Sequence, residues 1–223
     1  SIQQSDGNNL MHTLKLNGYG NRVLFACHSV TNPSTGKTNS GAVEVYEYNT
    51  TVSGDWAQVG STVYGEDPIS GNHNGEAIGQ PGVHGSAFNT KGDIFAIGSV
   101  NYGTTTLEGN YTGFQLGRVK LYAYRDVTDS DWTKIGDFIG QNTYTGQMGY
   151  LALNDAGTIV ATGETTDGND NVAGTVRVYE YEGDLSWNQI GGDIDGGANN
   201  DQFGLAIAFN SSGSIMAVGA QRT

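Results

Sequence analysis

Short strand-like runs, in which apolar residues alternate with polar ones or follow one another, recur along the chain between glycine-containing turns. Three of these runs are near copies and each opens on glycine, at 41–48, 117–124 and 174–181. In the third run the valines at 176 and 178 point to one face of a strand, and the tyrosines at 179 and 181 point to the other. Neither face is cleanly polar, so the pattern predicts strands in sheets that are covered on both faces.

Upstream of each run, two short apolar segments are joined by an Asn-x-x-Gly turn. This turn occurs four times, at 17–20, 89–92, 154–157 and 210–213. Asn at the first position and Gly at the fourth are typical of a type I turn that closes a hairpin. The turn therefore predicts two antiparallel strands in each unit before the glycine-led run.

A tryptophan motif, Trp-x-Gln/Lys-Val/Ile-Gly, follows each glycine-led run, at 56–60, 132–136 and 187–191. One unit then consists of a strand, a tight turn, a strand, a longer loop, a strand, an acidic turn and a strand with tryptophan. The turn glycines are 72, 65 and 56 residues apart, so the insertions vary in length while the four-strand core repeats. This repeat predicts an all-β fold, a β-propeller of four-stranded antiparallel blades with about three and a half blades present.

We expect a single propeller segment over residues 1–223, with blades near 10–60, 83–136 and 147–191 and an incomplete blade at 203–223. A tryptophan that recurs in every unit is expected to be a wedge between neighbouring blades, with ligand stacking as the alternative. Three and a half blades do not close an ordinary ring. The chain is therefore expected to be part of a longer protein or of a multi-chain assembly.

Composition and charge narrow the set of partners. The chain has 35 glycines and 3 prolines among 223 residues, and a formal net charge of −13. Nucleic acid and anionic membrane surfaces need a basic patch, which the ten scattered Lys and Arg do not form, and no apolar run is long enough for a membrane-spanning helix. The acidity suits divalent cations, cationic partners or a salty extracellular medium, with plain solvation as the alternative.

No catalytic pattern is visible in the sequence. The four histidines lack metal-ligand spacing, and there is no serine elbow or phosphate-binding glycine loop. Cys27 is the only cysteine and lies in an apolar run, which favours an inert core residue over a nucleophile. We therefore expect a protein that is not an enzyme.

The variable loops are expected to lie on one rim of the propeller, because in a four-strand meander the second-to-third strand loops and the inter-blade links emerge on the same face. Loops on a rigid scaffold are where binding residues accumulate, so this face is the expected site for a protein or glycan ligand. The segments concerned are 29–40, 61–83, 99–115, 140–147, 165–173 and 192–201.

Two of these loops are rich in oxygen ligands and are candidates for calcium, which takes six to eight oxygens in a turn that glycine allows to curl. Asp201 has an alternative reading as a turn-capping residue. The candidate ligands are Asp167, Asp170, Asp193, Asp195 and Asp201.

Three triplets match the N-glycosylation pattern, at Asn49, Asn110 and Asn210. Asn49 and Asn110 fall in expected loops. Asn210 already has a structural explanation, because it opens the fourth Asn-x-x-Gly turn.

The fourth unit carries Phe203-Gly204 before its turn and Val218-Gly219-Ala220 after it. With the Trp-x-Gln-Ile-Gly and Gly-x-Val-x-Val-Tyr motifs, this resembles the FG-GAP repeat of integrin-α-type β-propellers, in the divergent form found in surface proteins of algae, marine microbes and some large viruses. The Phe-Gly pair becomes Met148-Gly149 in the third unit and is shifted or lost at Val83-His84 and Leu10-Met11.

The resemblance implies a non-enzymatic extracellular module at a cell or particle surface, used for adhesion or surface assembly through its long-loop face. The alternatives are a non-catalytic propeller domain of a larger secreted hydrolase and a structural subunit of a surface filament or shell.

Overall fold

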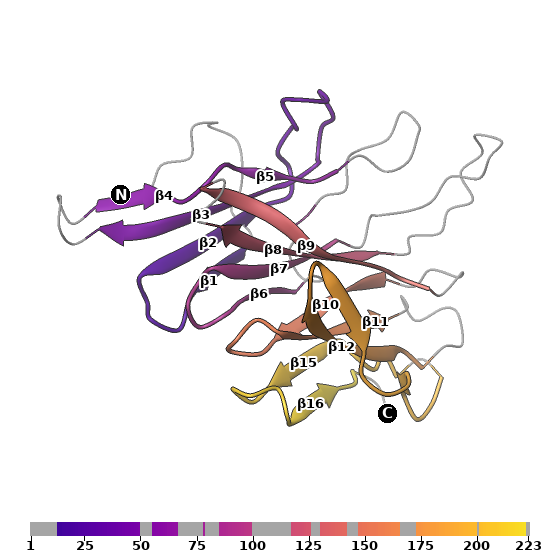
Figure 1. Cartoon of the computed structure of the whole chain (residues 1–223). Helices are drawn as coiled ribbons and strands as arrows, with labels where there is room; N and C mark the ends of the chain where they lie inside the picture. Colours follow the sequence, from indigo (N-terminus) through magenta and orange to yellow (C-terminus); the bar gives the residue numbers. More distant parts are fainter. Residues whose placement is uncertain are drawn as a thin grey trace.

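A computed structural model shows the fold of the chain (Figure 1). It describes residues 13–49, 55–66, 78, 85–99, 117–125, 130–141, 147–165, 173–199 and 201–221. These residues form sixteen strands and no helix. Every pair of neighbouring strands is antiparallel. The prediction of an all-β, antiparallel fold is confirmed.

The strands form four sheets in chain order. The first sheet contains β1 (Thr13–Leu16), β2 (Arg22–Cys27), β3 (Ala42–Asn49), β4 (Asp55–Gln58) and β5 (Val63–Tyr64). The second contains β6 (Ser86–Phe88), β7 (Ile94–Ser99), β8 (Arg118–Arg125) and β9 (Asp131–Ile139). The third contains β10 (Gln147–Leu153), β11 (Ile159–Thr165), β12 (Thr175–Gly183), β13 (Ser186–Gln189) and β14 (Ile194–Asp195), and the fourth contains β15 (Ala206–Phe209) and β16 (Met216–Gly219).

In the first three sheets four consecutive strands pair in the order in which they occur along the chain. The outer strand then continues past the glycine of the tryptophan motif and pairs with the beginning of the third strand. In the second sheet β9 does this as one strand with a register shift, whereas β5 and β14 do it as separate short strands. Segments 61–83 and 192–201, expected as loops, therefore contain strand residues.

The four Asn-x-x-Gly turns are formed as predicted. In each, the glycine N–H donates to the asparagine carbonyl at 3.0 Å, and the glycine has a φ between +71° and +79°, which favours this residue. The asparagine Oδ1 accepts the N–H of the residue five positions later, at 2.9 to 3.0 Å. Each asparagine thus closes its hairpin through both backbone and side chain.

The turns also bond to one another across the sheets. The Thr90 N–H donates to Asp155 O at 2.9 Å, and the Asp155 N–H donates to Ser211 O at 3.1 Å. The asparagine side chains extend this contact, since Asn17 Nδ2 donates to Lys91 O and Asn154 Nδ2 donates to Ser212 O. The hairpin turns of successive units therefore form a stack at one end of the sheets.

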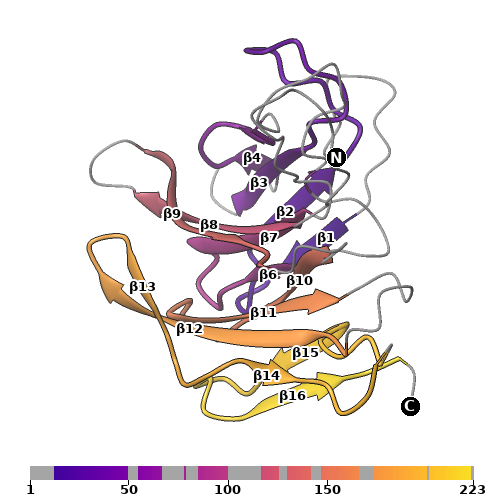
Figure 2. The same ribbon diagram turned by 90° about the vertical axis from the view of Figure 1, so that its right-hand side faces the viewer.

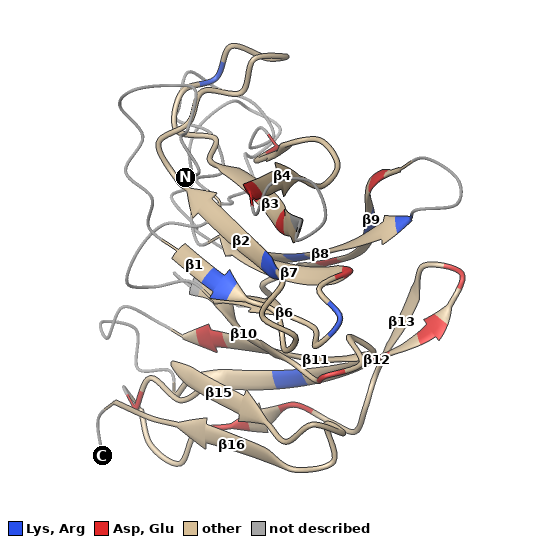
Figure 3. Ribbon diagram, turned by 90° about the vertical axis from the view of Figure 1, so that its left-hand side faces the viewer, with Lys and Arg blue, Asp and Glu red and all other residues tan. Residues whose placement is uncertain are grey.

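The sheets pack face to face in sequence order (Figure 2), and their first strands adjoin in the same order, β1 against β6, β6 against β10 and β10 against β15 (Figure 3). One core lies between the first and second sheets and includes Leu24, Val43 and Phe95. A second lies between the second and third sheets and includes Leu121 and Val160. The second sheet is therefore buried on both faces, as its residue pattern predicts.

Each core is closed by a tryptophan that bonds to the preceding sheet. Trp132 Nε1 donates to Val59 O and Trp187 Nε1 donates to Ile135 O, both at 2.7 Å. Val59 and Ile135 occupy the same place in the tryptophan motifs of their own sheets. The wedge interpretation of the repeated tryptophan is confirmed for these two residues.

Three bulky residues lie against the glycines that open the third strands. Gly117 has no room for a side chain because of the Met148 backbone, and Gly174 has none because of Phe203. Against Gly41 the equivalent place belongs to Ile78, whose N–H donates to Ser40 O at 3.1 Å. The counterpart of Phe203 in the second unit is therefore Ile78, and Val83 and His84, where the sequence shows the Phe-Gly pair shifted or lost, lie outside the described residues.

The asparagine turns give a direct test of this architecture. Asn154 is buried, so an N154A variant strands the Thr158 and Ile159 N–H groups, and we expect the free energy of unfolding to fall by about 2 kcal/mol. Asn210 makes the same turn in an exposed position, where water replaces the side chain, so N210A should lower it by less than about 1 kcal/mol. Urea unfolding of both variants measures the difference, and equal losses would contradict the role of the buried turn stack.

Candidate functional site

The first strands of the four sheets line a groove of about 470 Å³. Every sheet contributes to it, so residues from far apart in the sequence meet there. The lining residues are Thr13, Leu14 and Lys15 of β1, Gly85 and Ser86 at β6, Tyr150 and Leu151 of β10, and Leu205, Ala206 and Ile207 at β15. We refer to this site as the inner groove.

The polar groups of the inner groove are few and differ in character. Ser86 is only 8% exposed, and its Oγ has no hydrogen-bond partner among the described residues. Burial raises the pKa of the Tyr150 phenol, against the opposing effect of its hydrogen bond with Thr165, so the phenol keeps its proton at neutral pH. Lys15 adds one exposed cation. With aliphatic side chains around them, these groups suit a small polar ligand.

Ser86 is the most informative of these groups. A buried hydroxyl without a hydrogen-bond partner is unfavourable, by about 1–3 kcal/mol. Such groups are uncommon in folded proteins and each calls for an explanation. The Oγ itself is covered by protein, so a ligand in the inner groove would supply the missing partner with a local shift of the groove wall.

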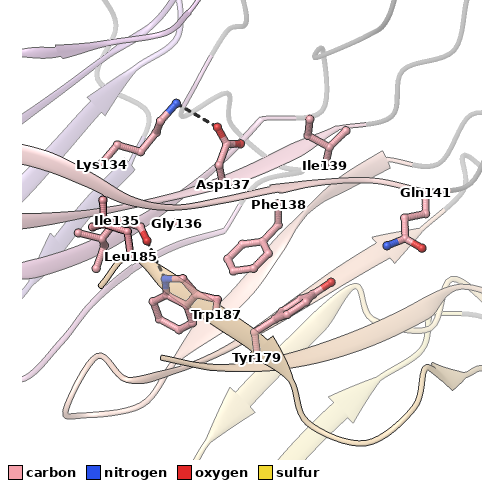
Figure 4. A pocket seen from close by; sticks show the side chains of 10 residues that line it. All are labelled: Lys134, Ile135, Gly136, Asp137, Phe138, Ile139, Gln141, Tyr179, Leu185 and Trp187. Carbon is pink, nitrogen blue, oxygen red and sulfur yellow. Dashed lines mark hydrogen bonds and ion pairs between the residues drawn. The ribbon is translucent and has the colours of Figure 1, made fainter. Parts of the chain in front are cut away.

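A second groove, of about 540 Å³, lies on the outer side between β9 and the β12–β13 hairpin (Figure 4). Phe138 stacks on Tyr179 with ring centroids 4.3 Å apart, and its ring meets Trp187 edge-on at 5.9 Å. The indole N–H of Trp187 is already bonded to Ile135 O. These aromatic groups therefore serve the contact between the second and third sheets.

Charged side chains lie at the margins of both cores. Between the first two sheets Arg118 forms a bidentate ion pair with Asp137, and its Nη1 lies 2.9 Å from Glu66 Oε2. Lys134 bonds to Glu66 at 2.8 Å and to Asp137 at 3.0 Å. Between the second and third sheets the buried Arg177 pairs with Glu164 at 2.6 Å and with Asp193 at 2.8 Å.

Asp137 and Asp193 occupy equivalent places in their units, each accepting from a basic residue of the third strand. Each also accepts from the residue two places after the tryptophan, Lys134 or Gln189. Because the same arrangement recurs in successive units, these acids belong to the repeat and are used for structure.

The described calcium candidates each have a protein partner. Asp193 accepts from Arg177 and Gln189, and these hydrogen bonds, that of Arg177 first, hold the pKa of its carboxyl below the ordinary value. Asp195 accepts the Thr175 hydroxyl at 2.8 Å, and Asp201 accepts the Ala198 N–H at 2.8 Å. The Asp201 contact is the turn cap that was the alternative prediction for this residue.

No group of three or more His, Cys, Asp or Glu side chains within the described ranges could hold a metal ion. Asp167 and Asp170 lie outside the described residues. Calcium binding stays a prediction.

The glycosylation candidates differ in their setting. Asn49 is the last residue of β3, paired with Asp55, and so is not in the loop where it was expected. Asn210 opens the β15–β16 turn, and its Nδ2 bonds to the hydroxyls of Ser212 and Ser214. Asn110 lies outside the described residues, and glycan attachment stays a prediction.

The long-loop rim, expected to bind a protein or glycan, lies mostly outside the described residues. Its described part at 29–40 is held by backbone bonds, such as Gly36 N–H to Asn32 O at 2.8 Å.

The inner groove could not be predicted from the sequence, because its residues come from four separate strands and only their packing brings them together.

Nothing in the described part of the chain is a helix able to cross a membrane. Cys27 is buried, as predicted.

No protein-family model and no curated protein sequence matches the chain. Solved structures share its fold. A crystal structure from Bacteroides fragilis, named as a "putative 6-phosphogluconolactonase", matches with a TM-score of 0.53 at 10% identity, over 94% of this chain and 47% of that one. A structure of the same name from Bacteroides uniformis has a TM-score of 0.48 at 11% identity, over 87% and 43%. A protein from Lactobacillus plantarum has 0.45 at 14%, over 85% and 43%.

These comparisons support a propeller-like fold and correct the predicted function. The chain spans less than half the length of the structures that it matches. The prediction of a non-enzymatic extracellular adhesion or surface-assembly module is wrong, because the Bacteroides fragilis structure with this fold is named as a "putative 6-phosphogluconolactonase". The FG-GAP resemblance receives no support either. The same name conflicts with the prediction that the chain is not an enzyme. The conflict is weak, because at 10% identity the likeness shows the fold alone.

The acids between the sheets predict a pH dependence of stability. Burial by itself raises the pKa of the Asp137 carboxyl, but the hydrogen bonds from Arg118 and Lys134 outweigh burial and leave it below the ordinary 3.8. A pKa that is lower in the folded state contributes stability that is complete above the unfolded value and is lost as pH falls through the folded value. The free energy of unfolding should therefore fall below about pH 4.

The D137N variant isolates this contribution. It should be less stable than the parent at neutral pH, and its free energy of unfolding should decline less steeply on acidification. Urea titrations from about pH 6 to about pH 2 provide the comparison. D155N serves as a control, because the Asp155 side chain is exposed and its backbone makes the turn contacts. Parallel acid profiles for D137N and the parent would count against the assignment.

Proposed function

We propose that this chain forms about half of a β-propeller and that its inner groove binds a small polyhydroxylated ligand. In this proposal each four-strand sheet is a blade, about three and a half blades are present, and further strands complete the ring. The strands come from a longer polypeptide or from a multi-chain assembly. The match to the Bacteroides fragilis structure supports this, since nearly all of this chain corresponds to about half of that one.

The single observation that carries the ligand proposal is the Ser86 hydroxyl, which is buried in the wall of the inner groove without a partner in the described part of the chain. In a propeller the first strands of the blades surround the central channel, which is a common place for a ligand. A ligand hydroxyl would supply the partner that Ser86 Oγ lacks, because a hydroxyl both donates and accepts.

The other groups of the groove narrow the ligand class. The protonated Tyr150 phenol can donate to a ligand oxygen and presents a ring face to a sugar. Lys15 can pair with an anionic group at the groove margin. A sugar acid or its phosphate combines these features. The names of the fold neighbours, which refer to 6-phosphogluconolactone, point to the same class of compound.

The S86A variant separates binding from folding. Removing an unpartnered buried hydroxyl should leave the free energy of unfolding unchanged or raise it by up to about 1 kcal/mol. The affinity for 6-phosphogluconate, measured by calorimetry, should fall about fivefold with the lost hydrogen bond. If S86A binds as tightly as the parent, the inner groove is not the site.

Lys15 provides a second test with a matched control. K15Q should weaken binding of 6-phosphogluconate more than binding of gluconate, since only the former carries a phosphate for the ammonium group. K37Q removes a cation from the 29–40 loop, which is not part of the groove, and should have no effect. Incubation of the parent chain with 6-phosphogluconolactone adds a further readout: hydrolysis that S86A and K15Q reduce would make the same groove catalytic.

A further inference from the structure

The third sheet repeats a tryptophan-receiving edge that no described residue fills. Val59 and Ile135, whose carbonyls accept the indoles of the next sheet, are 9% and 4% exposed. Ile190 occupies the same place in the third tryptophan motif and is 45% exposed. Trp132 and Trp187 fill the first two edges, and no indole of the described residues covers Ile190.

The backbone of this edge already has the conformation found at the first filled edge. Val59 N–H donates to Val45 O and Ile190 N–H donates to Val178 O, both at 2.8 Å. The glycines that follow have φ values of +69° at Gly60 and +71° at Gly191.

The glycines of the three edges differ in what lies above them. A Cβ added at Gly60 would lie 2.7 Å from Trp132 Cδ1, and one added at Gly136 would lie 3.1 Å from Trp187 Nε1. At Gly191 no atom of the described residues lies within 4 Å. The third edge therefore has the shape of an indole site with open space where the indole lies in the other two.

The fourth sheet is incomplete next to this edge. In the other sheets the second strand pairs with a third strand, whereas β16 pairs only with β15 among the described residues. Ala96 and Ala161 are fully buried in the second strands of their sheets, but the equivalent Ala217 is exposed. Ile215, the residue before β16, is exposed as well. Both the edge and the outer face of β16 thus lack the cover that their counterparts have.

We propose that the Ile190–Gly191 edge and the free edge of β16 together bind a β-hairpin whose second strand carries a tryptophan four residues before a glycine. The first strand of this hairpin pairs with β16, and its indole N–H donates to Ile190 O over Gly191. The inference rests on the proposed propeller and names the partner that fills its open side. What favours this occupant is continuity with an established interface, because the same contact is made twice within the chain.

The occupant is a hairpin and not a whole second copy of the chain. The inner half of this side is already occupied by β15, which packs on β10 and β11, and by β16, which pairs with β15. A complete sheet from another copy would need that same space. Two outer strands with a tryptophan fit beside β16 without displacing it.

A peptide of residues 174–191 is a suitable probe, because it contains the third and fourth strands of one unit with Trp187. Calorimetry with the full chain should detect binding of this peptide. W187A in the peptide should weaken binding at least about tenfold, and W187F, which keeps an aromatic ring but loses the N–H donor, about fivefold. L185A in the peptide is the control, since Leu185 lies in the exposed hairpin turn and should not alter the affinity.

Variants of the chain test the receiving edge. I190R places a charge where the indole should pack and should abolish peptide binding, whereas L16R, at an exposed leucine of β1, should leave it unchanged. Equal binding of the parent and W187A peptides would overturn the proposal. So would a chain that self-associates without peptide and loses this association in I190R, because a second copy would then be the occupant.

A covalent version keeps the proposal testable if the free peptide does not fold. Residues 174–191 are appended after Thr223 through a flexible linker of about ten residues. The melting temperature should rise by about 4 °C or more, and the appended W187A copy should remove most of this gain. No change with either copy would overturn the proposal. Binding of 6-phosphogluconate to the parent chain is measured separately, so failure of the hairpin does not affect the ligand proposal.

Discussion

The stacking of the sheets depends on one contact, the indole N–H that bonds to a backbone carbonyl of the preceding sheet. Trp132 reaches Val59 O and Trp187 reaches Ile135 O, in each case beside a glycine that leaves room for the ring. The contact combines a large apolar area with a directed hydrogen bond, so it fixes the register of one sheet on the next as well as their separation. A chain of such contacts makes each sheet stable only in the presence of its neighbour, as in other repeat proteins.

Charges lie beside the apolar cores without disrupting them because they are paired. Arg177 is nearly buried but contacts Glu164 and Asp193, and Arg118 contacts Asp137 and Glu66. An unpaired charge in these places would be strongly unfavourable, whereas a paired set contributes little net stability and much geometric specificity. These clusters explain why strands with charged residues, such as β8 and β12, can lie between two sheets.

Much of the fold could be predicted from the sequence because its signals are local and repeated. The Asn154–Gly157 turn and the strand that begins at Thr175 follow from residues close to one another in the chain. The place of Ile78 could not be predicted, since its role depends on contact with Gly41, and residues 79–85 separate it from β6. The inner groove could not be predicted for a similar reason. In the sequence Ser86 is an ordinary strand residue, and only the packing of four sheets places it at a groove. The predicted adhesion function came from motif likeness alone, which reports the packing rules of a blade and not its ligand.

The stack of asparagine turns has a mechanical consequence for this repeat. Because Thr90, Asp155 and Ser211 bond in series at one end, the spacing between sheets is set there, independently of what happens at the opposite end. The length of chain between successive turns can therefore vary, as the spacings of 72, 65 and 56 residues between turn glycines illustrate, while the turns stay in contact with one another. A unit can gain or lose residues elsewhere without losing its place in the stack.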